Sequence, residues 1–494
     1  MTGMQIGMMI IILIFTTVGS LTYFLVKKSG KRFIVAGKSL PFFIIGTMLF
    51  AQATEANGTL GGAGFAFTGG FWQGWVLSGG VGACLIITGI FYAKPMNRMN
   101  LITLPDFFFR RYNNVAEILV SIISIIGFTI MDAGCIAGAG WVLAWVFPVT
   151  LVQGMLIMAV VVFIYTLAGG IFSCAATDIL QLYPAFAAFV GSVIWLIAHY
   201  GWGFFAVSIP TNFLDFSAMT TMQGGALIFW SSFISMALGD VVALDFMERI
   251  FSADSPKTAS NGCFWGGTFT IIIAVCVGLL GVMGLALFPI LADPRDLLPR
   301  MATEVLPSML GLFLMAGVIG AGLSTANGGL LAVCAVFARN ILQRNVLRTR
   351  RQEMNDEERA QFDKWLLKAT RLMGIPVMAF TVFLAYLKPE PGVMLVLAFD
   401  TLLASCFVPL TLGIYWKKAN SAGAIAAILV GAVTRIIGYQ ITPVELAGLD
   451  TLIPPVLSLI TMVSVSLFTQ ESSVPKHHVI HEIPSDEMVL SAEA

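Results

Sequence analysis

Hydrophobic residues fall in long runs along this chain, separated by short polar or basic stretches. A helix needs about 20 apolar residues to cross a bilayer, because each residue advances it by 1.5 Å. The pattern predicts thirteen such helices and therefore an all-α polytopic membrane protein. The expected spans are residues 6–26, 42–67, 73–92, 115–141, 151–167, 178–198, 226–246, 264–287, 310–337, 369–386, 394–416, 423–441 and 452–468.

The second predicted span is unusual because its apolar run is loaded with glycine. Within residues 51–70 (AQATEANGTLGGAGFAFTGG) stand Gly58, Gly61, Gly62, Gly64, Gly69 and Gly70. Glycine weakens a helix interior by roughly 1 kcal/mol relative to alanine. In lipid, the freed backbone groups need partners inside the protein or in a wet cavity. Broken helices of this kind hold substrate and coupling ion in secondary transporters, so we expect a binding site at these glycines.

Composition supports the membrane class and excludes others. Hydrophobic residues make up 58% of the chain and charged residues 11%, with a mean hydropathy of +0.90. The 27 basic and 27 acidic residues cancel, which argues against a nucleic-acid partner. The seven cysteines lie in or beside apolar segments without CxxC spacing and are expected to be buried small hydrophobes. The His477–His478 pair is not expected to bind metal.

Basic residues predict the orientation in the bilayer. Lys27, Lys28, Lys31 and Arg32 follow the first span, and most other basic residues fall on the same side if the N-terminus is outside. Since cytoplasmic loops are enriched in Lys and Arg, we expect an N-out, C-in topology in the plasma (cell inner) membrane. The N-terminus lacks a positive n-region and a cleavage site, so the first span is expected to be a retained helix.

Two segments are polar enough to lie outside the bilayer. Residues 339–368 form the one long, highly charged stretch and are predicted to be a cytoplasmic surface connector with one short amphipathic helix. Residues 469–494 are predicted to be a poorly ordered cytoplasmic tail.

Three further stretches carry polar residues in an informative pattern. In 165–182 (YTLAGGIFSCAATDILQL), Asp178 follows a glycine pair, and Thr177 or Asp178 would also serve as a helix N-cap. In 317–340 (GVIGAGLSTANGGLLAVCAVFARN), Ser324 and Thr325 offer two hydroxyl ligands for a small hard cation, although the small residues alone would favour close helix packing. The third is 409–431 (PLTLGIYWKKANSAGAIAAILVG), a helix end, basic turn and helix start.

These stretches, in this order, resemble the sodium:solute symporter family, whose members carry sugars, amino acids, choline, pantothenate, carboxylates and iodide. The motifs nearest to its choline-transporter-like branch are FYAKPMNRMNLITLPD (91–106), YTLAGGIFSCAATD (165–178), ERIFSA (248–253) and FARN (337–340). The resemblance runs from about residue 33 to 438. Its combination of motifs is specific, whereas each motif alone is weak.

The resemblance implies a core of ten helices in two inverted five-helix repeats, with the first helix of each repeat broken. Residues 33–418, including the charged stretch 339–368, would form this core. One extra helix and a basic loop (1–32) would precede it, two helices (419–468) would follow it, and the tail (469–494) would end the chain. Together these segments account for the thirteen spans of the hydropathy pattern.

The resemblance also implies a sodium site between two of these helices. Family members hold Na⁺ with carbonyl oxygens of the first core helix and with carbonyl and hydroxyl oxygens of the eighth. The matching positions are Ala51 and Thr54 in the first helix and Ala321, Ser324 and Thr325 in the eighth. Asp178 matches the family's acidic residue on the cytoplasmic route out of that site.

Two departures from the family pattern bear on the solute and the ions. Where choline-transporter relatives carry an aromatic residue in the sixth core helix, this chain has Ala243, which argues against choline itself. Asn327, Gly328 and Gly329 stand where relatives often have further hydroxyls, so the sequence leaves a second sodium site open.

Four carboxylates lie inside apolar segments, where a central charge costs roughly 2.5–3.5 kcal/mol. They are Glu55, Asp132, Asp240 and Asp400. Each would either face a midplane pocket or pair with Arg435 or a helix end. A carboxylate pair facing a pocket would favour a cationic or zwitterionic amine. The expected solute-binding residues are Glu55, Asn57, Gly58, Trp75, Asp240 and Ala243, with tryptophan alternatively serving as an interface anchor.

The sequence therefore predicts a sodium-coupled symporter of a small polar organic solute that works by alternating access. One alternative is a proton-coupled symporter of the same fold, with Glu55 or Asp240 carrying the proton. A second alternative is a solute sensor that transports nothing. An enzyme is disfavoured because HExxH, GxSxG and clustered histidines are absent from the sequence.

Overall fold

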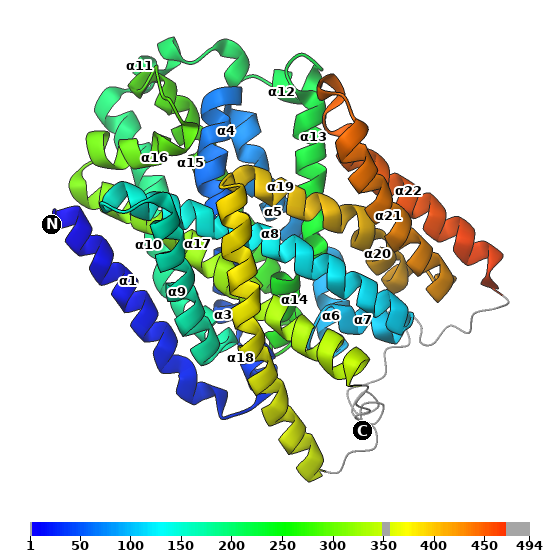
Figure 1. Ribbon diagram of the computed structural model, residues 1–494. Helices are drawn as coiled ribbons and strands as arrows, with labels where there is room; N and C mark the ends of the chain where they lie inside the picture. Colours follow the sequence, from blue (N-terminus) through cyan, green and yellow to red (C-terminus); the bar gives the residue numbers. More distant parts are fainter. Residues whose placement is uncertain (1, 348–355, 471–494) are drawn as a thin grey trace.

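The protein is an almost entirely helical bundle in the computed structural model, which describes residues 2–347 and 356–470 (Figure 1). Within these ranges, the extended pairing is limited to an isolated bridge between Leu40 and Ala253. Eleven described helices are long and apolar enough to cross a membrane, and a bent helix pair adds a twelfth. The all-α polytopic class is thus confirmed.

The α-helices of the described residues differ greatly in length. The long ones are α1 (Gly3–Leu21), α5 (Phe71–Ile87), α8 (Asn114–Val146), α9 (Leu151–Gly169), α10 (Ile171–Tyr200), α15 (Pro256–Leu287), α17 (Ser308–Val336), α18 (Asp356–Leu387), α21 (Ser421–Ile441) and α22 (Leu449–Phe468). The shorter ones are α2 (Gly30–Val35), α3 (Phe42–Ala53), α4 (Gly62–Gly69), α6 (Ala93–Arg98), α7 (Pro105–Arg111), α11 (Trp202–Ser208), α12 (Ser217–Thr220), α13 (Ala226–Ile234), α14 (Leu244–Ser252), α16 (Leu297–Arg300), α19 (Pro391–Leu402) and α20 (Val408–Tyr415).

Several helical segments depart from α geometry. The π-helical segments are η2 (Asn57–Gly61), η3 (Thr88–Tyr92), η5 (Ser235–Gly239), η8 (Met301–Val305), η9 (Phe337–Val346) and η11 (Leu403–Phe407). The 3₁₀ segments are η1 (Thr22–Val26), η4 (Thr211–Phe213), η6 (Asp240–Val242), η7 (Pro294–Asp296) and η12 (Val444–Leu446).

Local sequence signals set many of the helix ends. Thr150 and Gln153 form a capping box at the start of α9, and the Asn420 side chain accepts a hydrogen bond from the Gly423 amide at the start of α21. Gly170 lies between α9 and α10 with a positive φ of 57°, a conformation that favours glycine. Gly170 therefore favours the turn between α9 and α10.

Helix α17 forms the centre of the bundle. In its most apolar window 83% of the residues are buried, against 22% for α1 at the periphery. It packs against α8, α10, α3 and α18. Small residues make this possible: a β-carbon on Gly322 would lie 3.0 Å from both the Ala56 side chain and the Cys135 carbonyl oxygen. Backbones approach closely at such positions, as is typical of helix packing in membranes.

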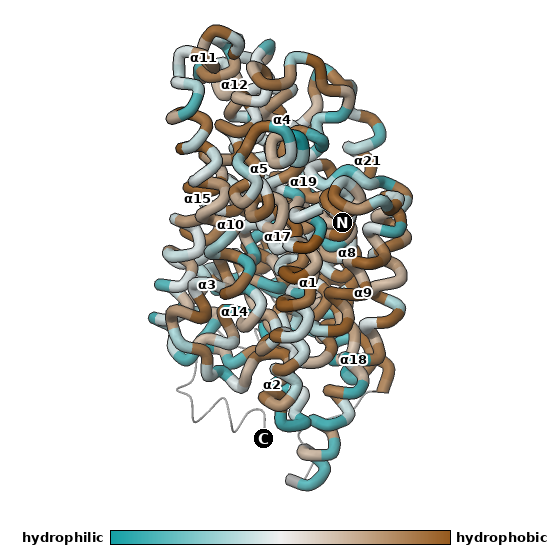
Figure 2. Tube along the Cα trace, turned by 90° about the vertical axis from the view of Figure 1, so that its left-hand side faces the viewer, coloured by the Kyte–Doolittle hydropathy of each residue, from teal (hydrophilic) through white to brown (hydrophobic). Residues whose placement is uncertain are grey.

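The outer helices expose apolar side chains, as expected for surfaces that face lipid. Residues such as Leu13 on α1 and Val160 on α9 are exposed. Figure 2 shows mainly brown, hydrophobic tube along α1 and α9, with teal stretches near α2 and the lower end of α18. On this side of the bundle, hydrophobic residues predominate along the outer helices, and hydrophilic residues are frequent at the lower end.

The second predicted span is broken, but the break precedes the glycines. Helix α3 ends at Ala53, Thr54 leaves helical geometry with φ −102° and ψ 83°, and the chain then continues as η2 and α4. The expectation that the glycines themselves unwind the helix is wrong. Each piece is too short to cross a bilayer alone, so the count of thirteen spans stays a prediction.

The glycines instead allow neighbouring segments to approach. A β-carbon on Gly61 would lie 2.7 Å from the Gly392 amide nitrogen, and one on Gly62 would lie 3.1 Å from the Gly74 carbonyl oxygen. Both contacts join the broken span to backbone of other helices, which cannot move aside as a flexible side chain can. Glycine is retained here for packing.

The predicted span 226–246 is also interrupted. It consists of α13, η5 and η6, followed by α14, and the axis turns by 46° at Ala243 between η6 and α14. The chain thus has two broken spans. The resemblance predicted breaks in the first helix of each repeat, and the spans 42–67 and 226–246 are the two concerned.

The charged stretch 339–368 is largely helical rather than a connector with its own short helix. Segment η9 extends from α17 to Val346, and α18 begins at Asp356 and runs without interruption into its apolar half. The prediction of a separate short amphipathic helix is therefore wrong for the described part of this stretch. Residues 348–355 and most of the predicted tail, including His477 and His478, lie outside the described residues.

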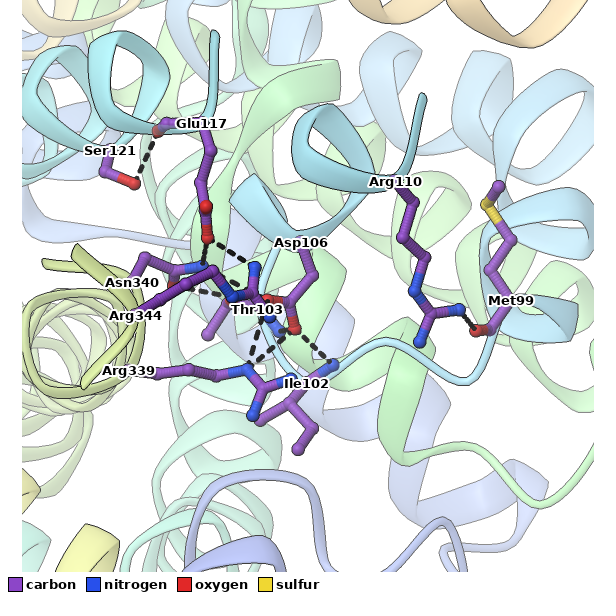
Figure 3. A network of polar contacts seen from close by, with 10 residues as sticks. All are labelled: Met99, Ile102, Thr103, Asp106, Arg110, Glu117, Ser121, Arg339, Asn340 and Arg344. Carbon is purple, nitrogen blue, oxygen red and sulfur yellow. Dashed lines mark hydrogen bonds and ion pairs between the residues drawn. The ribbon is translucent and has the colours of Figure 1, made fainter. Parts of the chain in front are cut away.

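A buried ionic network fastens α7 to η9 and the start of α8 (Figure 3). Asp106 accepts hydrogen bonds from Arg339 Nε at 2.8 Å and Asn340 Nδ2 at 3.1 Å, and Arg344 Nη2 lies 3.2 Å away. Arg344 also pairs with Glu117 at 2.5 Å. Burial alone would raise the pKa of Asp106, but the charges of Arg339 and Arg344 outweigh it and hold the pKa well below its usual range.

The packing role of Gly61 predicts opposite outcomes for two glycine substitutions. Gly61→Ala should destabilise the protein by about 1–3 kcal/mol, because the added methyl group meets backbone atoms of Gly392. Gly203→Ala on α11 has nothing within 4 Å of the new β-carbon and should be neutral or slightly stabilising. Thermal unfolding of the purified variants measures both effects, and equal midpoints for the two would contradict the packing role.

The Asp106 network predicts a pH-dependent loss of stability. Asp106→Asn should cost about 3 kcal/mol at neutral pH, because it leaves buried Arg339 without its carboxylate. A carboxyl group with a lowered folded-state pKa stabilises above its unfolded pKa of about 3.9 and loses this contribution as the pH falls further. Unfolding midpoints of wild type and variant should therefore converge below about pH 4. Glu445→Gln, at an exposed position, is the control.

Candidate functional site

Four of the five predicted sodium ligands surround one small cavity between the broken span and the central helix. Ala51 and Thr54 line it from α3 and its end, and Ala321 and Ser324 line it from α17. The Thr54 hydroxyl is buried without a hydrogen-bond partner. The remaining lining residues are Gln181, Leu182, Ala185 and Gly320. Oxygen donors from two helices therefore meet at the place where α3 ends.

Thr325, the fifth predicted ligand, is placed differently. Its hydroxyl donates to the Gln52 carbonyl oxygen at 3.3 Å, and the Gln52 side-chain amide donates to the Thr325 carbonyl oxygen at 2.9 Å. This reciprocal pair joins α3 to α17 beside the cavity, and Thr325 is not among the residues that line it.

Asp178 lies next to the same cavity. Ser324 Oγ donates to Asp178 Oδ1 at 2.7 Å, and both residues are fully buried or nearly so. The N-cap interpretation of Thr177 or Asp178 is wrong, because α10 begins at Ile171 and Asp178 lies about two turns after its start. One face of α10 thus presents Asp178 and, one turn later, Gln181 to the predicted ion site.

Arg249 connects this region to the second broken span. From α14, its Nη2 donates to Gln52 Oε1 at 2.5 Å and lies 3.9 Å from Asp178 Oδ2, and its Nη1 donates to the Asp245 carbonyl oxygen. Arg249 and Gln52 are absent from the sequence-predicted site. Their sequence signals are modest: Gln52 follows a predicted ligand, and Arg249 stands in the ERIFSA motif.

The predicted solute residues on the first broken span gather around Glu55. Asn57 Nδ2 donates to Glu55 Oε2 at 2.9 Å and to the Met131 carbonyl oxygen of α8 at 3.2 Å. Gly58 faces Ser78 of α5: a β-carbon on Gly58 would lie 2.6 Å from Ser78 Oγ. The break after α3 therefore carries a buried carboxylate in contact with α8 and close to α5.

Two more predicted carboxylates lie in the same region. Asp132 of α8 and Asp240 of η6 are each 2% exposed. The Asp132 carboxylate faces Gly329 of α17, since a β-carbon on that glycine would overlap Asp132 Oδ1. Ala243 is buried at the bend between η6 and α14. Both broken spans and α8 thus each carry a buried carboxylate.

Asp400 and Trp75 have other surroundings. Asp400 Oδ2 accepts hydrogen bonds from Arg435 Nη2 at 2.7 Å and Thr451 at 2.9 Å, and Arg435 also pairs with Asp450. Asp400 is therefore a carboxylate that pairs with Arg435, which was the alternative to facing a midplane pocket. Trp75 stacks on Phe233 of α13 and contacts Trp72, and among the described residues no hydrogen bond or ring contact joins it to the carboxylates.

Known proteins resemble the chain in sequence over most of its length. It is 25% identical to the human high affinity choline transporter 1 over 84% of this chain and 72% of that protein. It is 26% identical to the Escherichia coli sodium/pantothenate symporter (94% and 96%) and 26% identical to a Staphylococcus aureus sodium/proline symporter (89% and 88%). These similar identities single out no solute.

Solved structures resemble it in fold. A Na⁺-coupled sialic acid symporter in a substrate-bound outward-open state superposes with a TM-score of 0.71 at 15% identity, covering 95% of this chain and 98% of that one. A nucleobase-cation-symport-1 family transporter in a closed conformation superposes with a TM-score of 0.51 at 11% identity, covering 88% and 95%. The helical arrangement is therefore that of a known class of transporters.

The sequence profile of the sodium:solute symporter family matches residues 33–431, most of the chain. This match agrees with the family resemblance found in the sequence motifs and with the apolar helices of the structure. The chain is a transporter rather than an enzyme, and Na⁺ is its coupling ion. It belongs to the sodium:solute symporter family and is a multi-pass membrane protein that performs sodium-coupled solute symport.

Proposed function

We propose that sodium and solute bind at two neighbouring places in this symporter, both created by broken spans. Sodium would bind between α3 and α17, coordinated by Ala51, Thr54, Ala321 and Ser324, with Thr325 joining when it releases Gln52. The shared cavity supports this assignment, as does the unpartnered Thr54 hydroxyl inside it. Hard cations prefer oxygen ligands of this kind.

Asp178 would serve the inward release of the ion. Its carboxylate accepts the Ser324 hydroxyl directly, and Arg249 lies on its other side. A sodium ion that leaves Ser324 would next meet Asp178. With the N-terminus outside, as the basic residues favour, this route leads toward the cytoplasm of a plasma-membrane protein.

The solute would bind between the two broken spans, near Glu55, Asn57, Gly58, Asp240 and Ala243. The observation that supports an amine or a zwitterion is the set of buried carboxylates there. We assign Trp75 no direct contact with the solute, since it stacks on Phe233. The ten-helix core 33–418 would rock between outward-open and inward-open states around this site.

Sodium entry makes this transport concentrative. Moving one charge down a membrane potential of about 100 mV releases about 2.3 kcal/mol. By the relation between free energy and equilibrium constant, this supports roughly fiftyfold accumulation of a neutral solute. No ATP is required.

The sodium assignment predicts graded effects for two substitutions. Ser324→Ala should raise the Na⁺ concentration needed for half-maximal uptake about tenfold, equivalent to about 1.4 kcal/mol. Thr325→Val should have a smaller effect, because that hydroxyl is engaged with Gln52. The double variant should exceed both while still inserting into the membrane.

Thr434→Val is the matched control, since the Thr434 hydroxyl bonds only within its own helix, to Val430 and Gly431. Uptake of a radiolabelled solute into proteoliposomes, or Na⁺-dependent thermal stabilisation, measures the effect. An unchanged Na⁺ dependence in the double variant would place the ion elsewhere. An uptake rate that is unchanged when K⁺ replaces Na⁺, but that depends on an imposed pH gradient, would favour proton coupling.

A further inference from the structure

The side chain of Gln181 is buried in the ion cavity with its polar atoms unsatisfied. Gln181 lies on α10, is 3% exposed and lines the cavity between α3 and α17. Among the described residues, neither its carbonyl oxygen nor its amide nitrogen has a hydrogen-bond partner of normal geometry. A buried carboxamide without partners costs free energy, so such groups are rare unless a water, an ion or a ligand satisfies them. Gln181 is therefore a candidate ligand for whatever binds in this cavity.

Packing against α17 holds Gln181 at this place. A β-carbon on Gly320 would lie 3.1 Å from Gln181 Cβ and 3.4 Å from its Cγ, so the stem of the glutamine rests on a glycine of α17. Ala321 follows Gly320 directly on α17, and Ser324 follows it after about one turn. The Gln181 carboxamide thus borders the stretch of α17 that carries the proposed sodium ligands.

The nearby Tyr165 hydroxyl cannot satisfy the Gln181 carbonyl oxygen. Tyr165 lies on α9 and donates its proton to the Leu323 carbonyl oxygen at 3.1 Å. Because a phenol has only one proton, its oxygen can act toward the Gln181 side chain only as an acceptor, from the amide N–H group. The carbonyl oxygen of Gln181 is therefore the group that is left for a cation.

The chemistry of an amide oxygen suits the ion that this protein carries. Hard cations accept side-chain amide oxygens as ligands and are surrounded by about six oxygens in proteins. The proposed sodium site draws on four residues of α3 and α17, whereas the Thr325 hydroxyl is bonded to the Gln52 carbonyl oxygen. An oxygen from α10 extends this incomplete shell on the side that faces Asp178.

From these observations we propose that the side-chain oxygen of Gln181 is a further sodium ligand, so that α3, α17 and α10 hold the ion together. This role rests on the proposed sodium site and adds a third helix to it. Asp178 stands three residues before Gln181 on α10, which places the two side chains on the same face of the helix. An ion bound to Gln181 is thus already in contact with the helix that carries its proposed exit residue.

Two substitutions separate an oxygen ligand from a side chain that only fills space. Gln181→Met keeps the length of the glutamine but replaces its carboxamide by a thioether, which is a poor ligand for a hard cation. Gln181→Glu keeps a hard oxygen at the same reach. We expect Gln181→Met to raise the Na⁺ concentration for half-maximal thermal stabilisation about tenfold, and Gln181→Glu to stay within about threefold of wild type. Gln181→Leu, which also lacks a hard oxygen, is the second variant and should behave as Gln181→Met does.

The measurement uses Na⁺ itself as the probe and needs no solute. Purified full-length protein is titrated with Na⁺ at constant ionic strength, with K⁺ as the replacing cation, and the thermal unfolding midpoint is recorded. The midpoint in K⁺ alone shows that each variant folds. Gln343→Met is the matched control, because Gln343 on η9 is also buried but is not among the residues that line the cavity. Its response to Na⁺ should equal that of wild type.

A wild-type Na⁺ response in Gln181→Met and Gln181→Leu would overturn the ligand role, as would an equal loss in these variants and in Gln181→Glu, which indicates packing alone. A weakened response in Ser324→Ala would in those cases leave the sodium site itself in place. An unchanged response in the Ser324→Ala, Thr325→Val double variant would instead count against the sodium site. The two failures are therefore distinguishable.

Discussion

Hydrocarbon offers no hydrogen-bond partner to a carboxylate or to an open turn of backbone, and this constraint governs the interior of the symporter. Asp400 satisfies it with Arg435 and Thr451, and Asp178 satisfies it with Ser324. The open turn at Thr54 is followed by Thr59, whose amide and hydroxyl both donate to the Glu55 carbonyl oxygen. The Thr54 hydroxyl, in contrast, is buried without a hydrogen-bond partner beside the ion cavity.

The ion cavity and the second broken span are joined by a short series of direct contacts. Ser324 bonds to Asp178, Asp178 faces Arg249, and Arg249 belongs to α14 just beyond the bend at Ala243. Gln52 closes the series, because it contacts both Arg249 and Thr325. A cation that pulls Ser324 away from Asp178 therefore changes the electrostatic surroundings of Arg249. If sodium binds as proposed, this series gives it a physical route to influence α14 of the second broken span.

Much of the fold could be predicted because the signals are local. Apolar runs of the required length mark the spans, and the glycine-rich run drew attention to the second span, although its glycines remain helical. The position of the break could not be predicted, since Gly61 and Gly62 are needed for contacts with Gly392 and Gly74 that are distant in sequence. For the same reason Gln52, Arg249 and Asp245 were missed: the reach of each side chain depends on how α3, α10 and α14 pack. The contact of Asp178 with Ser324 could not be derived from local sequence, because it depends on how α10 packs against α17; only the family resemblance had placed the two residues near one site.

Arg435 forms ion pairs with both Asp400 and Asp450, and this has a consequence for the evolution and engineering of such carriers. The last two helices supply both the arginine and Thr451 to a carboxylate that lies one turn before η11, where the chain also contacts η5 of the second broken span. A shortened carrier that ended after α20 would lack Arg435 and Thr451 and would leave the buried Asp400 carboxylate without these partners. Helices α21 and α22 thus neutralise a charge of the transport core. Relatives that lost these two helices would have to replace Asp400 at the same time.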